Sequence, residues 1–181
     1  TDNGLFRYDG YQFHHYVHEK MLSYSLFDIH EDYDGNLYCK NLNGQIFRFN
    51  AEKMELFHTI PDSLSTSYFF YEFLPDRSLV VSAKSIYQYS NGQVKTLLPA
   101  QEFHYHQSEM TRDSLGALLI YGKKNTLYKI DTNGVQHIEV FIDQHQARII
   151  YDQQDIFAAT NGIIQKAKSS TDLHFEPVYD L

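Results

Sequence analysis

A short strand motif that returns about every 40 residues constrains the fold of this chain more than any other feature of its sequence. The motif LFRY at residues 5–8 recurs as IFRF at 46–49, IYQY at 86–89 and LYKI at 127–130, with a weaker copy, IIQK, at 163–166. A period of roughly 20–50 residues indicates a repeat architecture, in which one small unit stacks on its neighbours to build a continuous core.

A second apolar segment precedes every copy but the first at nearly the same spacing: NLYC at 36–39, SLVV at 78–81, ALLI at 117–120 and DIFA at 155–158. Seven of the nine glycines follow Asn or Asp. Asn-Gly and Asp-Gly between apolar segments are the strongest short-range signal for a β-hairpin, because both residues tolerate the positive φ angles of a type I′ turn. We therefore expect these dipeptides to mark joins between antiparallel strands.

Four short strands fit into each period, and in the first complete unit we expect them at 25–31, 36–40, 45–50 and 54–60. No window sustains the apolar spacing of a helix. Four antiparallel strands per repeat of about 40 residues are typical of a β-propeller blade, and the apolar runs at 79–81 and 118–120 fit inner strands covered on both faces. A single β-sandwich also uses short strands, but the regular period favours the propeller.

The sequence thus predicts an all-β fold, a β-propeller with four-stranded blades. A half blade and linker occupy 1–24, and the blades occupy 25–65, 66–103, 104–144 and 145–181. The first two strands correspond to the third and fourth strands of a blade, so the chain holds about four and a half blades. Because a half blade leaves unpaired strand edges, we expect residues 1–181 to be a partial propeller segment of a larger ring.

Residues 25–49 resemble the two-component regulator propeller repeat. The segment EDYDGNLY at 31–38 follows that family's Glu-Asp-x-x-Gly-Asn-Leu-Trp pattern, and NGLFRY at 3–8 and TNGI at 160–163 follow the second half of the repeat. The sequence departs from the pattern at Tyr38, where the family has Trp, and at Lys40 and Asn41, where it has Gly-Thr. These exchanges alter packing inside a blade and leave the expected fold unchanged.

The resemblance implies the ligand-sensing periplasmic part of a bacterial inner-membrane regulator, with propellers of typically seven blades. Regulators of this family are hybrid histidine kinases or fusions to a DNA-binding domain that govern polysaccharide use. An oligosaccharide ligand, a homodimer of the full-length sensor and contact with the remaining blades of the same protein are therefore expected. Kinase, DNA-binding and membrane-anchoring parts would lie outside this segment, which would itself be non-catalytic.

Composition excludes several other classes of protein. The net charge is −8, from 15 Lys and Arg against 23 Asp and Glu, which argues against direct binding of nucleic acid or an anionic membrane. A hydrophobic content of 43% excludes a disordered chain. The single cysteine, Cys39, cannot form an internal disulfide and lies in an expected inner strand, so we expect a small core residue.

Neither a metal site, nor a cofactor, nor a catalytic group is predicted. The segment DYDG at 32–35 is reminiscent of a calcium loop, but His30 and Asn41 occupy two of its ligand positions. The clustered histidines at 14, 15 and 18 lack further residues at a metal-ligand spacing. There is no Gly-x-Ser-x-Gly nucleophile motif. Glu31 and Asp32 are adjacent at a turn rather than opposed as glycosidase carboxylates are.

Polar residues in the loops between blades and between second and third strands are the candidate ligand contacts, since clustered Lys suits an acidic sugar or a phosphate. They are Lys84, His104, His106, Lys123, Lys124, Asn125 and Arg148. The 28 Phe and Tyr residues could stack on sugar rings, but most are expected to fill blade interfaces. A protein-binding scaffold without a small ligand, and a polysaccharide-acting hydrolase or lyase, are the alternative functions.

Overall fold

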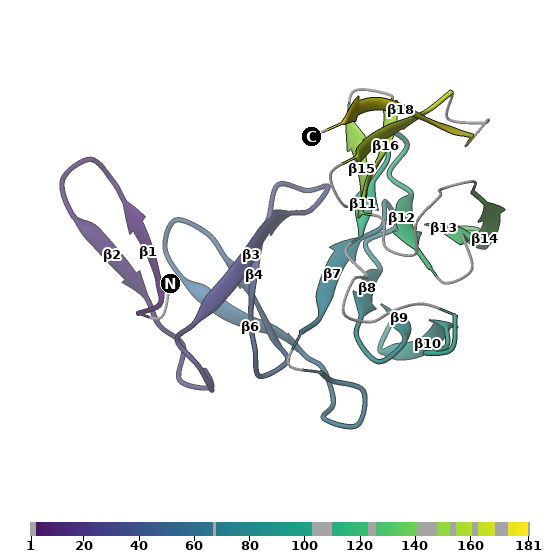
Figure 1. Ribbon diagram of the computed structural model, residues 1–181. Coiled ribbons are helices and arrows are strands. Elements are labelled where there is room, and N and C mark those ends of the chain that lie inside the picture. Colours follow the sequence, from purple (N-terminus) through teal and green to yellow (C-terminus); the bar gives the residue numbers. More distant parts are fainter. Residues whose placement is uncertain are drawn as a thin grey trace. The chain divides into compact units, whose positions relative to one another are not determined.

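The computed structural model of the chain is built from antiparallel β-sheets (Figure 1). It describes residues 3–66, 68–102, 110–122, 126–140, 148–152, 155–160, 163–168 and 174–180, and no helix occurs among them. The strands of this part of the chain form one two-stranded sheet and four four-stranded sheets, each paired in chain order. The predicted all-β, partial β-propeller fold with four-stranded blades is therefore confirmed.

We name the five sheets by their place in the chain. The half blade consists of β1 (Leu5–Tyr8) and β2 (Phe13–Tyr16). Blade 1 consists of β3 (Leu26–Glu31), β4 (Leu37–Asn41), β5 (Gln45–Phe49) and β6 (Met54–Thr59). Blade 2 consists of β7 (Phe70–Phe73), β8 (Leu79–Ser82), β9 (Ile86–Ser90) and β10 (Gln93–Leu98). Blade 3 consists of β11 (Thr111–Arg112), β12 (Leu118–Tyr121), β13 (Thr126–Asp131) and β14 (Gly134–Glu139). Blade 4 consists of β15 (Arg148–Asp152), β16 (Asp155–Thr160), β17 (Ile163–Ala167) and β18 (Phe175–Asp180).

The chain divides into two compact units, 1–69 and 70–181. In the first unit the half blade packs on blade 1, because Tyr16 joins a core cluster with Leu26, Cys39 and Phe47. The Tyr16 hydroxyl also donates a hydrogen bond to the carbonyl of Asn50. Cys39 is fully buried, as predicted, and burial raises the pKa of its thiol to about 12, so it is an inert core residue.

In the second unit, strand β12 is buried on both faces. Leu118 and Ile120 belong to a cluster with Val80 and other residues of blade 2, whereas Leu119 belongs to a cluster with Ile149 and other residues of blade 4. Successive side chains of a strand point to opposite faces, so adjacent residues of β12 pack against different blades. The apolar run at 118–120 therefore forms an inner strand covered on both sides, as the sequence indicates.

The Asp-x-x-Gly segment of the repeat forms a turn capped by its own aspartate. Asp32 Oδ1 accepts the backbone N–H groups of Asp34 and Asn36, both at 2.9 Å. Its other oxygen accepts hydrogen bonds from the side chain of Asn36 (2.9 Å) and from the hydroxyl of Tyr38 (3.0 Å). Tyr38, at the position of the family's Trp, thus binds the turn. The carboxylate is used within the hairpin, which agrees with the prediction of a turn rather than a calcium loop.

Asp32→Ala is expected to lower the free energy of unfolding by about 1–2 kcal/mol at pH 7, since several donors lose a charged acceptor. Burial raises the pKa of the Asp32 carboxyl, but the hydrogen bonds from Asn36, Asp34 and Tyr38 outweigh it and the net shift is downward. This stabilisation is complete above the unfolded pKa of about 4 and is lost as pH falls through the folded pKa. Urea unfolding at pH 7 and at pH 3 measures the difference in free energy of unfolding between the wild type and Asp32→Ala. A difference that is as large at pH 3 as at pH 7 would contradict the role of the Asp32 carboxylate in the turn. Asp34→Ala is the matched control.

Blade 2 uses the same turn without glycine. The Arg77 N–H donates to the carbonyl of Leu74 at 2.8 Å, as Gly35 donates to Asp32 and Gly116 to Asp113. Arg77 must therefore adopt a φ of 67°, in the left-handed region that costs a side-chain-bearing residue about 1–2 kcal/mol. Arg77→Gly is expected to raise the free energy of unfolding by about 0.5–1 kcal/mol after the entropy of glycine in the unfolded chain is subtracted. Asn91→Gly, at a residue type that tolerates this region, should gain less in the same urea titration. A lower free energy of unfolding for Arg77→Gly than for the wild type would contradict the claim that the backbone of Arg77 is strained.

The type I′ geometry expected at the Asn-Gly and Asp-Gly joins occurs at Asn91–Gly92, where both residues have positive φ (51° and 74°). Elsewhere in the described chain the glycine alone takes a positive φ, as at Gly35 and Gly44. The joins at Gly10, Gly35 and Gly44 are longer turns in which an Asp or Asn side chain replaces part of the backbone hydrogen bonding, whereas Gly134 directly follows a two-residue turn at 132–133. The dipeptides therefore mark hairpins, but most of these hairpins are not two-residue turns.

Candidate functional site

The loops of each blade are divided between its two ends. Because its four strands alternate in direction, the joins from first to second strand and from third to fourth strand lie at one end, which we call the turn end. The joins from second to third strand and from the fourth strand to the next blade lie at the other end, which we call the crossover end. Any ligand site in a loop belongs to one of these two ends.

The structure describes two of the seven predicted ligand contacts. Lys84 lies between β8 and β9, at the crossover end of blade 2, and its side chain is exposed. Arg148 is the first residue of β15, so its backbone begins at the crossover end of blade 4. The other candidates lie outside the described residues: His104, His106, Lys123, Lys124 and Asn125. The structure thus assigns Lys84 and the backbone of Arg148 to the same kind of end, on different blades, and these are the two predicted contacts that it describes.

The first strands of blades 2, 3 and 4 are joined by polar contacts that the sequence analysis missed. The Arg112 guanidinium on β11 forms an ion pair with the buried carboxylate of Glu72 on β7. On the other side of β11, the Thr111 hydroxyl donates a hydrogen bond of 2.8 Å to the carbonyl of Ile149 on β15. These contacts set the alignment of three successive blades, so their role is to couple the blades.

A hollow of about 340 Å³ opens at the turn end of blade 1. Glu55 lies between two cations there, 2.9 Å from Arg48 Nη2 and 2.5 Å from Lys53 Nζ. The hydrogen bond from Lys53, followed by that from Arg48, lowers the pKa of the Glu55 carboxyl. Asn36, Asn50 and Phe49 complete the lining. Phe49 is buried, so the hollow offers charged and amide groups to a ligand without an aromatic stacking surface.

A second, smaller hollow of about 180 Å³ lies at the turn end of blade 3, with Pro75 of blade 2 on its rim. Lys129 reaches its wall but is paired with Asp113 at 2.9 Å. Asp113 in turn caps its hairpin by accepting the N–H groups of Leu115 (2.9 Å) and Ala117 (2.8 Å). The charged groups of this hollow therefore serve the turn, and the hollow at blade 1 is the better candidate at this end.

Lys40, one of the departures from the family pattern, is buried in a charged contact. Its ammonium lies 2.5 Å from Asp28 Oδ2, donates to the carbonyl of Phe69 and lies 4.7 Å from the centre of the Phe69 ring. Asp28 adopts a φ of 51° where β3 is interrupted by a bulge between Phe27 and His30. Lys40 thus holds the first strand of blade 1, and its role is structural.

The described residues contain no group of three or more His, Cys, Asp or Glu arranged to hold a metal ion. His14 is bonded to Asp9 Oδ2 at 2.5 Å, whereas His15 stacks on Phe6 with ring centres 4.3 Å apart. Hydrogen bonds from the Gln12 backbone and the His14 side chain hold the pKa of Asp9 well below its usual range. Within the described chain there is also no helix of the length and apolarity needed to cross a membrane.

No protein-family model matches this sequence, and no curated protein sequence matches it either. Similar solved structures include virginiamycin B lyase from Staphylococcus aureus, with a TM-score of 0.70 at 16% identity over 99% of this chain and 64% of that one. The extracellular domain of the putative one component system BT4673 from B. thetaiotaomicron gives a TM-score of 0.73 at 16% identity over 98% of this chain and 26% of that one. The extracellular domain of the putative hybrid two component system BT3049 from the same organism gives 0.62 at 13% identity, over 98% and 26%.

Identities this low establish a shared fold and no more. The chain is a partial β-propeller, and its fold matches extracellular domains of putative one- and two-component systems. It spans less than two thirds of the length of each of these structures. The fold expected from the two-component regulator propeller resemblance is therefore present, and the same fold is also found in a lyase.

Proposed function

We propose that this chain is the ligand-sensing, non-catalytic propeller segment of an extracytoplasmic sensor in a bacterial membrane-bound regulator, and that its ligand is an oligosaccharide. The observation that carries the proposal is the superposition of 98% of the chain on the extracellular domain of a putative one component system. The repeat motif at 31–38, read independently from the sequence, leads to the same class of protein.

Two sites compete for the ligand. The crossover end carries Lys84 and the start of β15 at Arg148, and the turn end of blade 1 carries Arg48, Lys53 and Glu55 around the 340 Å³ hollow. Both offer cations and polar groups that suit a carboxylated or hydroxyl-rich sugar. We propose the crossover end as the ligand site and keep the turn end of blade 1, whose charged groups pair with one another, as the alternative.

In this proposal the ligand acts by population shift. It binds one arrangement of the propeller blades more tightly than another, and this difference in affinity biases an output domain outside the segment. The remaining blades of the same protein complete the ring, and the full-length sensor acts as a homodimer. Contacts such as Glu72 with Arg112 couple neighbouring blades, so they are the routes by which ligand binding on one blade changes the next.

Titration of the protein with neutral and uronic-acid oligosaccharides is expected to raise its midpoint of thermal unfolding. At a ligand concentration of 100 times Kd, the free energy of unfolding should increase by about 2.7 kcal/mol. Lys84→Gln is expected to weaken binding of the acidic sugar at least about fivefold, at roughly 1 kcal/mol for a lost charged contact. Arg48→Gln tests the turn end, and Lys95→Gln, on the exposed fourth strand of blade 2, is the matched control. Absence of binding by every oligosaccharide would overturn the sensing proposal.

Absence of catalysis is part of the proposal and needs its own assay, since a lyase shares the fold. Incubation with polysaccharides, followed by measurement of reducing ends and of unsaturated products, is expected to show no turnover. Product release that is abolished by a single substitution at either blade end would establish an enzyme instead.

A protein-binding scaffold is the second candidate function, favoured by the exposed aromatic side chains of the half blade. A stable protein partner, recovered together with a complete lack of response to oligosaccharides, would replace the sensing proposal by this one.

A further inference from the structure

Asparagine–glycine dipeptides are places where a polypeptide can modify itself without an enzyme. The glycine nitrogen attacks the side-chain carbonyl carbon of the asparagine, ammonia leaves, and a cyclic succinimide forms. One water molecule then opens the ring to give aspartate or isoaspartate. Glycine favours this reaction because it has no side chain to obstruct the attacking nitrogen or to restrict rotation of the backbone. Whether a given dipeptide reacts therefore depends on how the fold holds it.

The chain contains five such dipeptides, and the structure describes four of them. They begin at Asn3, Asn43, Asn91 and Asn133, and the fifth, at Asn161, lies outside the described residues. The reaction needs a dipeptide that is exposed to water, a glycine N–H that can lose its proton, and a backbone that can rotate to bring the two reacting atoms together. These three conditions separate the four dipeptides.

The turn at Asn91–Gly92 meets all three conditions. It joins β9 to β10 (Figure 1), both of its residues are exposed, and a side chain built on Gly92 would meet nothing within 4 Å apart from its chain neighbours. The Gly92 N–H donates no hydrogen bond to a described residue. The first four residues of β10, from Gln93 to Thr96, are exposed as well. Opening of this hairpin tip therefore uncovers no core side chain.

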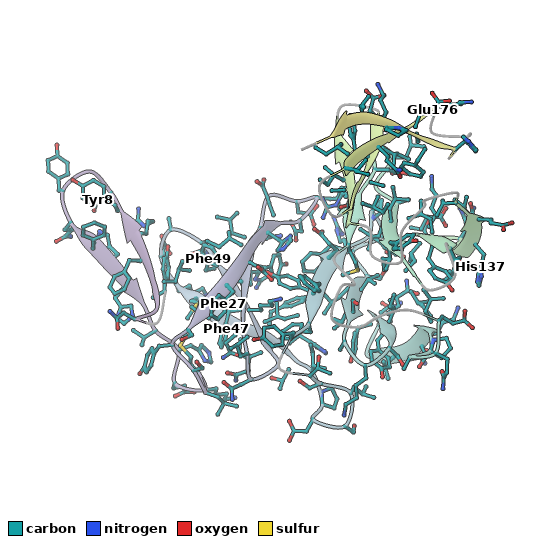
Figure 2. All side chains as sticks on the ribbon, viewed as in Figure 1. Tyr8, Phe27, Phe47, Phe49, His137 and Glu176 are labelled. Carbon is teal, nitrogen blue, oxygen red and sulfur yellow. The ribbon has the colours of Figure 1, made fainter. Side chains whose placement is uncertain are left out.

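The turn at Asn133–Gly134 is held by a neighbouring carboxylate. Asp131 Oδ1 accepts the N–H of Asn133 at 2.7 Å and that of Gly134 at 3.2 Å. The negative charge of the carboxylate opposes loss of the glycine proton, which the attack requires. The same hairpin is also fixed further along its strands, where the rings of Tyr128 and His137 meet edge to face with their centres 4.8 Å apart. Figure 2 labels His137 on this hairpin.

The glycines of the other two described dipeptides are buried. Gly44 packs against Ile60, whose N–H donates to the Gly44 carbonyl at 2.8 Å. A side chain built on Gly4 would begin 2.5 Å from Nε2 of His15, so this glycine lies directly against the imidazole ring. Rotation of either backbone would break these contacts, and the fold therefore slows the reaction at both dipeptides.

We propose that the turn at Asn91–Gly92 is a modification site, where the folded protein converts Asn91 to isoaspartate and aspartate with uptake of one water molecule and release of ammonia. Isoaspartate adds a methylene group to the main chain, so the two-residue turn no longer aligns Ser90 with Gln93. The modified hairpin opens from its tip, whereas Leu98, in the core shared with blade 3, keeps the far end of β10 in place. The site is independent of the proposed ligand.

Peptide mapping by mass spectrometry, during incubation of the protein at mildly alkaline pH, tests the proposal. The side-chain amide of Asn91 is expected to be lost at least about tenfold faster than that of Asn43 or Asn133, because its turn opens most easily. In urea the three sites should react at similar rates, since they share the same dipeptide. Equal rates in the folded protein, an equally large lead of Asn91 in urea, or a product without isoaspartate would each overturn the proposal.

Asp131→Ala tests the reason for the selectivity. The substitution releases the Gly134 N–H, so the reaction at Asn133 is expected to accelerate at least about threefold while the rate at Asn91 stays unchanged. Asp32→Ala, which removes a turn aspartate from blade 1, is the matched control and should change neither rate. An unchanged rate at Asn133 in Asp131→Ala would overturn the protecting role of this carboxylate.

The consequence for blade 2 has its own measurement. The modified protein carries one additional negative charge, so anion exchange separates it from the unmodified protein. Hydrogen exchange at the amide of Gln93 is expected to be at least about tenfold faster in the modified form, whereas exchange at Ile120, in the buried strand β12, should not change. Equal exchange at Gln93 in the two forms would overturn the opening of the hairpin.

Discussion

Truncation of Leu118 to alanine is expected to lower the free energy of unfolding by about 3–4 kcal/mol, because a buried leucine leaves a cavity that the surrounding sheet cannot fill. Leu118 has no exposed surface and belongs to the cluster shared by blades 2 and 3. Urea unfolding followed by tyrosine fluorescence measures the change. Leu115→Ala, in the exposed turn before the same strand, should stay within about 0.5 kcal/mol of wild type.

The neighbouring residue extends this test to the opposite face of β12. Leu119→Ala should cost a similar amount, but its cavity opens between blades 3 and 4. Hydrogen exchange should therefore increase in blade 2 for Leu118→Ala and in blade 4 for Leu119→Ala. Equal effects of both variants on the two blades would contradict a strand that faces a different blade with each side.

Much of the fold could be predicted because its information is local and repeated. Each strand of blade 1 lies where the alternation and the turn residues placed it, for example β5 at Gln45–Phe49. Each hairpin is closed within a few residues, by an aspartate such as Asp32 or by a glycine of positive φ. Strands that are distant in the sequence do not pair with one another in the described chain, since every sheet joins consecutive strands. The strand order of each sheet therefore follows from the sequence order.

The contacts between blades were missed, although a signal was present. Glu72 and Arg112 are 40 residues apart, one repeat, and they carry opposite charges on equivalent first strands. A carboxylate in an otherwise apolar strand, one period before a cation, predicts an ion pair between neighbouring blades. Candidate ligand contacts were predicted only in loops, whereas these two residues lie in strands.

The ligand site could not be derived in the same way. The candidate residues were chosen for charge and loop position, and five of the seven lie outside the described residues. Loop conformation depends on contacts with other parts of a propeller rather than on a repeated local pattern. The hollow lined by Arg48 and Glu55 was also missed, because its residues come from the ends of different strands and have no common motif.

Replacement of Asp28 by asparagine is expected to cost about 2–3 kcal/mol, because it removes the counter-ion of a buried ammonium. Lys40 is 5% exposed, and its Nζ lies 2.5 Å from Asp28. Asparagine tolerates the left-handed backbone of residue 28 as well as aspartate does, so the charge is the only change. Breaking a fully buried ion pair typically costs roughly 3–5 kcal/mol. The cost expected here is smaller, because the Asp28 side chain is partly exposed.

A double variant separates the ion pair from the other contacts of Lys40. If the cost arises from an uncompensated charge, Lys40→Met in the Asp28→Asn background should recover at least about 1 kcal/mol, because the methionine is apolar and of similar length. Urea unfolding of the wild type, the two single variants and the double variant gives the coupling energy directly. A coupling below about 0.5 kcal/mol would mean that water screens the pair. Phe69, through its carbonyl and ring, would then be the partner that holds Lys40 in the first unit.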